Sequence, residues 1–288
     1  MQWGLLGQVL ALGMLLAPTH LLVPGYVMLS QALSGMAKDL NKMSAKSSLK
    51  LLVPDTAEGQ LYRWVSWLTG SKNAMKGVGF FVGGALLTGF GFQGAIAFMA
   101  GVLLLIWLMS FLALPPDLGK ASFKPKFRQL FAKSKQINQL AAARLCLFAA
   151  RDVWFVIALP VTLAEQFGWQ HTNIGGFLAC WVIGYGLVQS LAPSLTGRSA
   201  EAVPKPIHAL GWVLLLTAIP FLMALFDPQT NQLWVLLAGL AVFGVVFAVN
   251  SSVHSYLIVH YAARDGVSLD VGFYYMANAL GRLAGTLL

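Results

Sequence analysis

Positive charge alternates between successive connections of this chain. Of its 19 Lys and Arg residues, sixteen lie in every second connection between nine apolar segments. Seven fall between Lys38 and Lys76, six between Lys120 and Lys135, and the others are Arg198, Lys205 and Arg264. This alternation is typical of a polytopic membrane protein whose basic connections face the cytoplasm. We therefore expect a multi-pass protein of the cell (inner) membrane, with both long basic loops cytoplasmic.

The composition supports a membrane protein and excludes several other classes. Apolar residues make up 58% of the chain and charged residues 10%, unlike a soluble domain. The net charge of +9 is spread over loop flanks rather than gathered on one face. We therefore expect the lipid bilayer, and no nucleic acid, as a partner. The two cysteines lie in apolar runs without metal-ligand spacing, and we expect no metal and no cofactor.

The apolar segments predict an all-α bundle. Several approach the roughly 20 residues that a helix needs to cross a bilayer, and the shorter ones can recruit flanking residues. Glycines recur at close spacing, which lets helix backbones approach each other in lipid. These glycines are Gly77, Gly79, Gly83, Gly84, Gly239 and Gly244. The nine segments are Trp3–Ala17, Leu21–Met36, Gly77–Phe90, Gly94–Leu114, Ile137–Leu163, Ile174–Leu191, Ala209–Phe226, Leu233–Val259 and Val271–Leu288.

A Lys-rich stretch divides the chain into two parts. Residues 115–136 form a predicted basic central loop in the cytoplasm. Residues 1–114 precede it with four membrane segments, and residues 137–288 follow it with five. The other long basic connection, Lys38–Asn73, contains predicted helical stretches broken near Pro54.

Four lysines form one stripe after the second segment. Lys38, Lys42, Lys46 and Lys50 recur every four residues, and so share one face of a helix. For Lys38 and Lys42, nearest the membrane, binding of a substrate anion and a solvated face are both open. For Lys46 and Lys50 we expect a solvated cytoplasmic face or a contact with lipid headgroups.

The fifth segment carries charges at membrane depth. Arg144 and Arg151 are seven residues apart on one face, and Asp152 follows. Such charges are costly in lipid and indicate functional sites. We predict that Arg151 binds substrate, with a structural ion pair to another helix or a place near a membrane interface as the alternatives. Arg144 stays undecided, because it could extend to the cytoplasmic interface. We expect Asp152 to be a poor partner for Arg151, since adjacent residues point in different directions on a helix; it is a candidate proton carrier.

Polar residues also form stripes in the last two segments. Asn250 and His254 share a face of the eighth segment and are candidate substrate ligands. His254 is a candidate proton carrier as well, and hydrogen bonding between helices is the alternative for both residues.

In the ninth segment, Tyr274, Asn278 and Arg282 lie at successive steps of four. We predict that these three side chains line a substrate cavity, and that Asp270, one step earlier, is a helix N-cap.

Common enzyme motifs are absent from the sequence. It contains no G-x-x-x-x-G-K-[ST], no H-E-x-x-H and no G-x-S-x-G. We therefore expect a protein that is not an enzyme.

Five long stretches of the sequence are unusual. They are ALSGMAKDLNKMSAKSSLKLLVP (Ala32–Pro54), LTGSKNAMKGVGFFVGG (Leu68–Gly84), KPKFRQLFAKS (Lys124–Ser134), ARDVWFVIALPV (Ala150–Val161) and NSSVHSYLIVHYAARDGVSLDVGFYYMANALGRLAGTLL (Asn250–Leu288). These stretches resemble the ArsJ family, the organoarsenical efflux permeases of the major facilitator superfamily. The resemblance implies a bundle with about nine of the superfamily's twelve helices present, and hence a fragment lacking two helices at the front and one at the back.

The resemblance also implies a substrate and a functional partner. The substrate would be 1-arseno-3-phosphoglycerate, which glyceraldehyde-3-phosphate dehydrogenase makes from arsenate, and its export would give arsenate resistance. Independently, Arg151, Arg282 and either Lys38 or Lys42 suit a small molecule with several oxyanions. The alternative is a generic major facilitator carrier of another organic anion or of a drug. A membrane scaffold or a membrane enzyme is less favoured.

Overall fold

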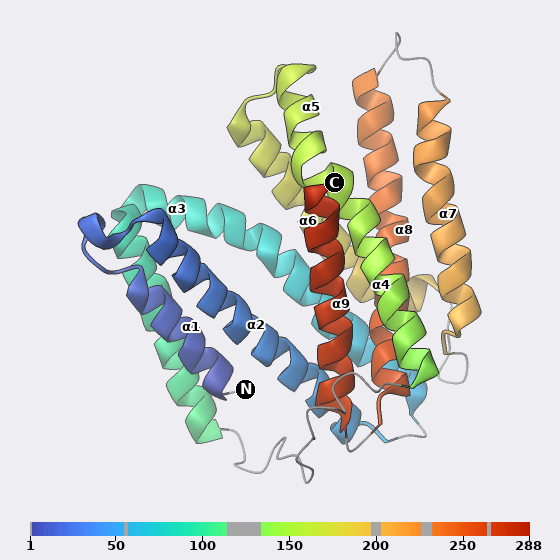
Figure 1. The fold of residues 1–288 in the computed structure, drawn as a ribbon, viewed down its shortest axis with the longest axis horizontal. Coiled ribbons are helices and arrows are strands. Elements are labelled where there is room, and N and C mark those ends of the chain that lie inside the picture. The colour runs from blue at the N-terminus through green and yellow to red at the C-terminus, as the bar shows by residue number, and fades with distance from the viewer. Residues whose placement is uncertain (1, 55–56, 114–133, 197–202, 226–231, 264–265) are drawn as a thin grey trace. The chain divides into compact units, whose positions relative to one another are not determined.

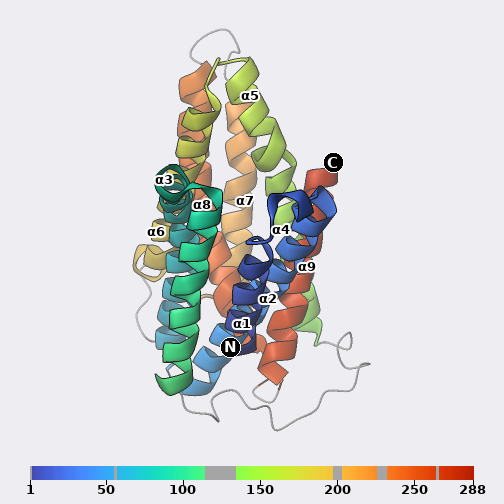
Figure 2. The same ribbon diagram turned by 90° about the vertical axis from the view of Figure 1, so that its left-hand side faces the viewer.

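The described part of the chain is helical throughout. The computed structural model describes residues 2–54, 57–113, 134–196, 203–225, 232–263 and 266–288, and no strand occurs among them (Figures 1 and 2). The elements are α1 (Gln2–Met14), the short 3₁₀ helix η1 (Thr19–Leu21), α2 (Pro24–Leu52), α3 (Glu58–Ala113), α4 (Lys135–Val153), the π-helical turn η3 (Trp154–Ala158), α5 (Leu159–Glu165), α6 (His171–Leu195), α7 (Pro206–Ala224), α8 (Gln232–Tyr261) and α9 (Val267–Leu287).

The predicted multi-pass helical protein is confirmed. Five helical stretches are long and apolar enough to cross a membrane, judged by length and composition alone. They are Glu58–Ala113, Lys135–Glu165, His171–Leu195, Pro206–Ala224 and Gln232–Tyr261. The predicted central loop, 115–136, lies outside the described residues except for its last three, where α4 begins at Lys135.

The chain forms two compact units. One comprises Met1–Ser48 with Phe81–Lys124, and the other comprises Leu49–Phe80 with Pro125–Leu288. Helix α3 therefore contributes to both units. Its helical geometry is interrupted at Gly91, whose φ of 65° lies in the left-handed region that glycine adopts without strain. This break separates the two apolar segments that the sequence predicts around Gly89–Gly94.

In the first unit, α1 packs closely on α2. Gln8 donates to the Ser34 carbonyl oxygen at 2.9 Å, and Ser30 donates to the Ala11 carbonyl oxygen at 2.7 Å. A side chain at Gly4 would collide with Ala37 of α2, because an added Cβ would lie 2.9 Å from its carbonyl oxygen. Helix α2 runs through the lysine stripe to Leu52 and α3 starts at Glu58, which confirms helical stretches broken near Pro54.

In the second unit, three helix pairings position the candidate site. Helix α9 packs along α4, while α8 packs against both α6 and α7; Figure 1 shows α9 beside α4 and α7 beside α8. The aromatic and aliphatic core between these helices includes Phe148, Tyr185, Phe243 and Phe247.

Small residues set some of these helix contacts. A Cβ added at Gly77 would lie 2.4 Å from the Ala179 carbonyl oxygen of α6, so this predicted packing glycine does permit close approach. Gly239 and Gly244 face the side chains of Met223 and Trp181, respectively. Gly79, Gly83 and Gly84 have open space at the Cβ position among the described residues, so a packing role for them stays a prediction.

A candidate anion-binding site

Helices α4 and α9 approach so closely that side chains along both can meet. A Cβ added at Gly281 would lie 2.2 Å from the Leu145 carbonyl oxygen, and one at Gly285 would lie 2.4 Å from that of Ala149. Only glycine fits at such distances. The spacing of four residues places both glycines on one face of α9, the small-residue pattern that brings membrane helices together.

One carboxylate joins two arginines across this contact. Arg151 of α4 donates its Nε–H to Asp152 Oδ1 at 2.6 Å, and Arg282 of α9 donates its Nε–H to Asp152 Oδ2 at 2.8 Å. Arg151 Nη2 is also paired with Asp152. Each carboxylate oxygen therefore serves one guanidinium group. We call these three residues the arginine–aspartate trio.

The expectation that Asp152 is a poor partner for Arg151 is wrong. The Cα–Cβ bonds of adjacent helical residues do diverge, but the long Arg151 side chain brings its guanidinium group back to the carboxylate. The helix is also irregular immediately afterwards, because the Trp154 N–H bonds to the Arg151 carbonyl oxygen and a π-helical turn begins. Pro160 follows in α5 and has no N–H for a regular helical bond, which favours such a wide turn.

A second cluster of polar side chains surrounds Arg144, two turns before Arg151 on α4. Arg144 donates to Asn278 Oδ1 of α9 at 3.0 Å and to Ser251 Oγ of α8 at 2.8 Å. Ser251 also accepts from Gln189 Nε2 of α6 at 3.3 Å, and Gln189 Oε1 accepts from Asn73 Nδ2 of α3 at 2.6 Å. Arg144 is buried, with 6% of its surface exposed, so it does not extend to an interface.

An aromatic side chain separates the two clusters. The Phe148 ring centroid lies 4.0 Å from Arg144 Cζ and 4.5 Å from Arg151 Cζ. The Phe247 and Phe155 rings also face Arg151, at 5.3 and 5.8 Å. Guanidinium groups are attracted to ring faces, and more strongly where water is excluded. These rings therefore hold the arginines in apolar surroundings without neutralising their charge.

Positive charge exceeds negative charge in this region. Arg151 and Arg282 share the carboxylate of Asp152, and the described contacts of Arg144 are to the neutral Asn278 and Ser251. The carboxylate side chain is 1% exposed and that of Arg151 14%, whereas the Arg282 side chain is 54% exposed. The combination of uncompensated arginine charge and one accessible guanidinium group suits the binding of an anion.

The structure brings together five of the sequence-predicted site residues. Arg151, Asp152 and Arg282 form the trio, and Asn278 bonds to Arg144. Tyr274 is fully buried with its ring centroid 5.3 Å from Arg144 Cζ, and its hydroxyl has no hydrogen-bond partner among the described residues. The predicted stripe of Tyr274, Asn278 and Arg282 thus follows the α4 contact. Its role in substrate binding stays a prediction.

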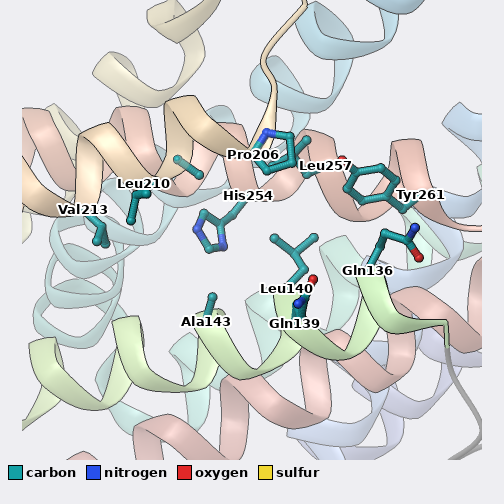
Figure 3. A pocket seen from close by; sticks show the side chains of 11 residues that line it. Gln136, Gln139, Leu140, Ala143, Pro206, Leu210, Val213, His254, Leu257 and Tyr261 are labelled. Atoms are coloured by element: carbon teal, nitrogen blue, oxygen red, sulfur yellow. The ribbon is translucent and has the colours of Figure 1, made fainter.

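His254 and Asn250 lie apart from the trio. His254 points into a cavity of about 260 Å³ between α4, α7 and α8, beside Gln136, Gln139 and Tyr261 (Figure 3). Asn250, one turn earlier on α8, is completely buried, and neither its amide oxygen nor its nitrogen has a hydrogen-bond partner in the described chain. Substrate binding by either residue, and proton transfer by His254, stay predictions.

The lysine stripe is not part of the trio. Lys38 and Lys42 belong to the other compact unit, where Lys42 pairs with Asp39 at 2.6 Å. Lys46 and Lys50 are both buried, so the solvated face expected for them is wrong. Lys50 donates to the His260 carbonyl oxygen at 3.1 Å. The lysine instead satisfies a carbonyl near the end of α8.

The expected N-cap at Asp270 is also wrong. Helix α9 begins at Val267 with Gly266 as its N-cap residue. Asp270 lies one turn inside and accepts a hydrogen bond from the Ala263 N–H at 3.2 Å. The carboxylate therefore ties the helix to the preceding connection rather than capping the first N–H groups.

Three polar residues of the Arg144 network are missing from the sequence prediction. Gln189 and Ser251 are buried within apolar helices, and Asn73 lies in a basic connection. Their polarity amid apolar neighbours is a usable signal. Nothing in the local pattern, however, shows that α3, α6 and α8 present them to the same arginine.

The fold and the sequence define the class of protein. The sequence profile of the Major Facilitator Superfamily matches residues 140–288, which include every residue of the trio. Two solved transporters resemble the structure with a TM-score of 0.68. The human organic anion transporter MFSD10 (TETRAN) is 16% identical, with 99% of this chain and 69% of that chain covered. A bacterial homologue of the iron transporter ferroportin, in the outward-facing state, is 20% identical, with 99% and 75% covered.

The profile match, which covers more than half of the chain, establishes the family. A comparison with curated proteins finds no match. At 16% and 20% identity, the structural likeness shows the fold alone. The chain is a multi-pass helical membrane protein of the transporter class. It belongs to the Major Facilitator Superfamily.

Proposed function

We propose that this transporter exports an organoarsenical, 1-arseno-3-phosphoglycerate, and thereby gives arsenate resistance. The observation that carries the proposal is the arginine–aspartate trio, in which two guanidinium groups from α4 and α9 share one carboxylate. The particular substrate is supported by the resemblance of the long sequence stretches to organoarsenical permeases. The dehydrogenase that makes this molecule, glyceraldehyde-3-phosphate dehydrogenase, is the proposed functional partner.

The spacing of the arginines fits an elongated anion. Arg144 and Arg151 are seven residues apart on α4, a rise of about 10 Å along the helix axis. A three-carbon molecule with an acyl arsenate at one end and a phosphate ester at the other presents oxyanions at both ends. Guanidinium groups bind such oxyanions through paired hydrogen bonds. We propose that Arg144 and the trio each receive one end.

Export of such an anion is electrically favourable. Moving one negative charge out of a cell with a negative interior gains about 2.3 kcal/mol per 100 mV of membrane potential. The substrate is also made inside the cell, so its own gradient points outward. Asp152 and His254 stay candidates for proton coupling, which these driving forces do not require.

The proposal is tested by measuring arsenic in cells that express the full-length protein, with its membrane insertion verified. Cells are supplied with arsenate, with and without additional glyceraldehyde-3-phosphate dehydrogenase. We expect less retained arsenic than in control cells, and a larger difference when the dehydrogenase is abundant. Unchanged retention in cells with verified membrane protein would overturn the proposed substrate.

A second candidate is a carrier of another organic anion or of a drug. The same excess of arginine would bind carboxylates or other phosphates, and one structurally similar protein is described as an organic anion transporter. Competition separates the two candidates. Organic anions or drugs without arsenic that are themselves exported, while the organoarsenical is not, would favour the generic carrier.

A further inference from the structure

Asp152 occupies the place where an oxyanion would bind the two arginines. Its two oxygens accept Nε–H groups of Arg151 and Arg282 at 2.6 and 2.8 Å. A phosphate, arsenate or carboxylate ligand would accept from the same donors with similar geometry. The carboxylate is therefore chemically equivalent to one end of an anionic ligand.

Arg151 makes more contacts with Asp152 than Arg282 does. Arg151 belongs to the same helix as Asp152, is paired with it through both Nε and Nη2, and is 14% exposed. Arg282 comes from α9, contacts Asp152 through Nε and is 54% exposed. An incoming anion can therefore reach Arg282 first. If it takes Arg282 away, Asp152 keeps Arg151, so the buried carboxylate is never left without a partner, which would be costly.

No other negative group competes for this role within the described contacts. The charged groups that face Asp152 are Arg151 on its own helix and Arg282 on α9. Arg144 lies two turns away on α4 and bonds to the neutral Asn278 and Ser251. Tyr274, on the same face of α9, lies beside Arg144.

We propose that Asp152 is a built-in counter-anion: it holds the two arginines in the empty transporter, and a substrate oxyanion displaces it from Arg282. The proposal rests on the proposed function only in treating this site as an anion site. Asp152 then competes with the substrate oxyanion for Arg282, and this competition sets the substrate affinity. An exporter gains from such competition, because a weakened hold on its substrate allows release.

The experiment changes the formal charge of the trio in steps. The wild-type trio carries +1, Asp152→Asn makes it +2, Arg282→Gln makes it 0, and the double variant returns it to +1. The probe is radiolabelled sulfate, which stays a dianion across the physiological pH range, and its binding to purified full-length protein is measured by scintillation proximity. The control is Asp270→Asn, which removes an acid about 18 Å away along α9.

We expect Asp152→Asn to bind sulfate at least about tenfold more tightly than wild type, because an adjacent opposing charge is gone. Arg282→Gln should lose most binding, the double variant should regain it in part, and Asp270→Asn should match wild type. In transport of the organoarsenical, Asp152→Asn should lower KM and also lower kcat. If the Asp152 carboxylate were purely structural, its removal would lower sulfate affinity or protein yield. It would not lower KM and kcat together.

Each outcome decides something. Weaker sulfate binding by folded Asp152→Asn would overturn the counter-anion role. If Asp152→Asn fails to fold, the double variant decides, because binding no better than that of Arg282→Gln overturns the proposal. No sulfate binding by wild type would instead count against an anion site, and thus against the proposed function. Sulfate binding with the expected order but no arsenic export would leave the counter-anion standing and reject the organoarsenical substrate.

Discussion

Phe148 and its two arginines show how charge is kept within an apolar helix bundle. The ring lies between Arg144 and Arg151, and each guanidinium group also has polar partners on its other side. A lone charge at this depth would be expensive. Here the cost is offset by hydrogen bonds and ring contacts, so the arginines stay charged, oriented and ready to bind an anion.

Replacing either trio arginine by lysine should impair transport although the charge is kept. Lysine has no planar fork and cannot bond to two ligand oxygens in the same way. We expect Arg151→Lys and Arg282→Lys each to lose on the order of 1.5–3 kcal/mol of anion binding. Sulfate affinity and transport per amount of membrane protein are measured, with the exposed Arg63→Lys as control. Wild-type values in both trio variants would rule out an oxyanion clamp.

Replacing the ring between the arginines by an aliphatic side chain should also weaken anion binding. Phe148→Leu removes the ring contact of both guanidinium groups, and we expect it to lower sulfate affinity by about 0.5–2 kcal/mol. Phe243→Leu is the matched control, since both phenylalanines are 7% exposed in the same core and no arginine of the described residues contacts the Phe243 ring. Equal losses in the two variants would show that packing, rather than the cation–ring contact, is responsible.

At the scale of elements, the glycines of α9 determine whether the trio can form. Gly281 lies directly before Arg282 and has the Leu145 carbonyl oxygen where a Cβ would be. We expect Gly281→Ala to push α9 from α4, with an overpacking cost of about 1–3 kcal/mol. Thermal stability of the purified protein and sulfate binding should both fall.

The control for this variant is Gly184→Ala in α6, where the Cβ position has open space. It should keep its stability, because alanine favours a helix more than glycine does. If Gly281→Ala is as stable as Gly184→Ala and binds sulfate normally, the close approach of α4 and α9 is not what positions the arginines.

Periodicity predicts the elements better than it predicts their contacts. The apolar segments and the stripe of Tyr274, Asn278 and Arg282 follow from local spacing, because a helix repeats every 3.6 residues. The pairing of Arg151 with its neighbour Asp152 does not, because it depends on side-chain length and on a π-helical turn. Likewise, the burial of Lys50 depends on a carbonyl of α8 that is remote in sequence.

At the scale of the whole molecule, the predicted orientation can be tested with paired cysteines. Gln136 lies in the first turn of α4 beside a basic connection, and Gln170 precedes α6 in a connection without Lys or Arg. In a background with Cys146→Ser and Cys180→Ser, we expect a membrane-impermeant thiol reagent to label Gln170→Cys, but not Gln136→Cys, in intact cells. Labelling of Gln136→Cys from outside would reverse the orientation.

The convergence of helices on Arg144 lies beyond any single-segment prediction. Asn73, Gln189 and Ser251 come from α3, α6 and α8, and only the packing of these helices joins them into one network. The same is true of Arg282. Sequence spacing places it on a polar helix face, but does not predict its pairing with Asp152. The helical, multi-pass class is therefore readable from charge and hydropathy, whereas the site needs the tertiary structure.

The most direct test of an arginine-based exporter uses everted membrane vesicles that contain the full-length protein. Arsenate, glyceraldehyde-3-phosphate, NAD and the dehydrogenase are added outside, and arsenic trapped in the vesicles is measured. We predict accumulation with wild-type protein that requires the dehydrogenase and is largely lost with Arg282→Gln at equal membrane abundance. Equal accumulation with Arg282→Gln, or accumulation from arsenate without the dehydrogenase, would contradict export of the organoarsenical through the arginine–aspartate trio.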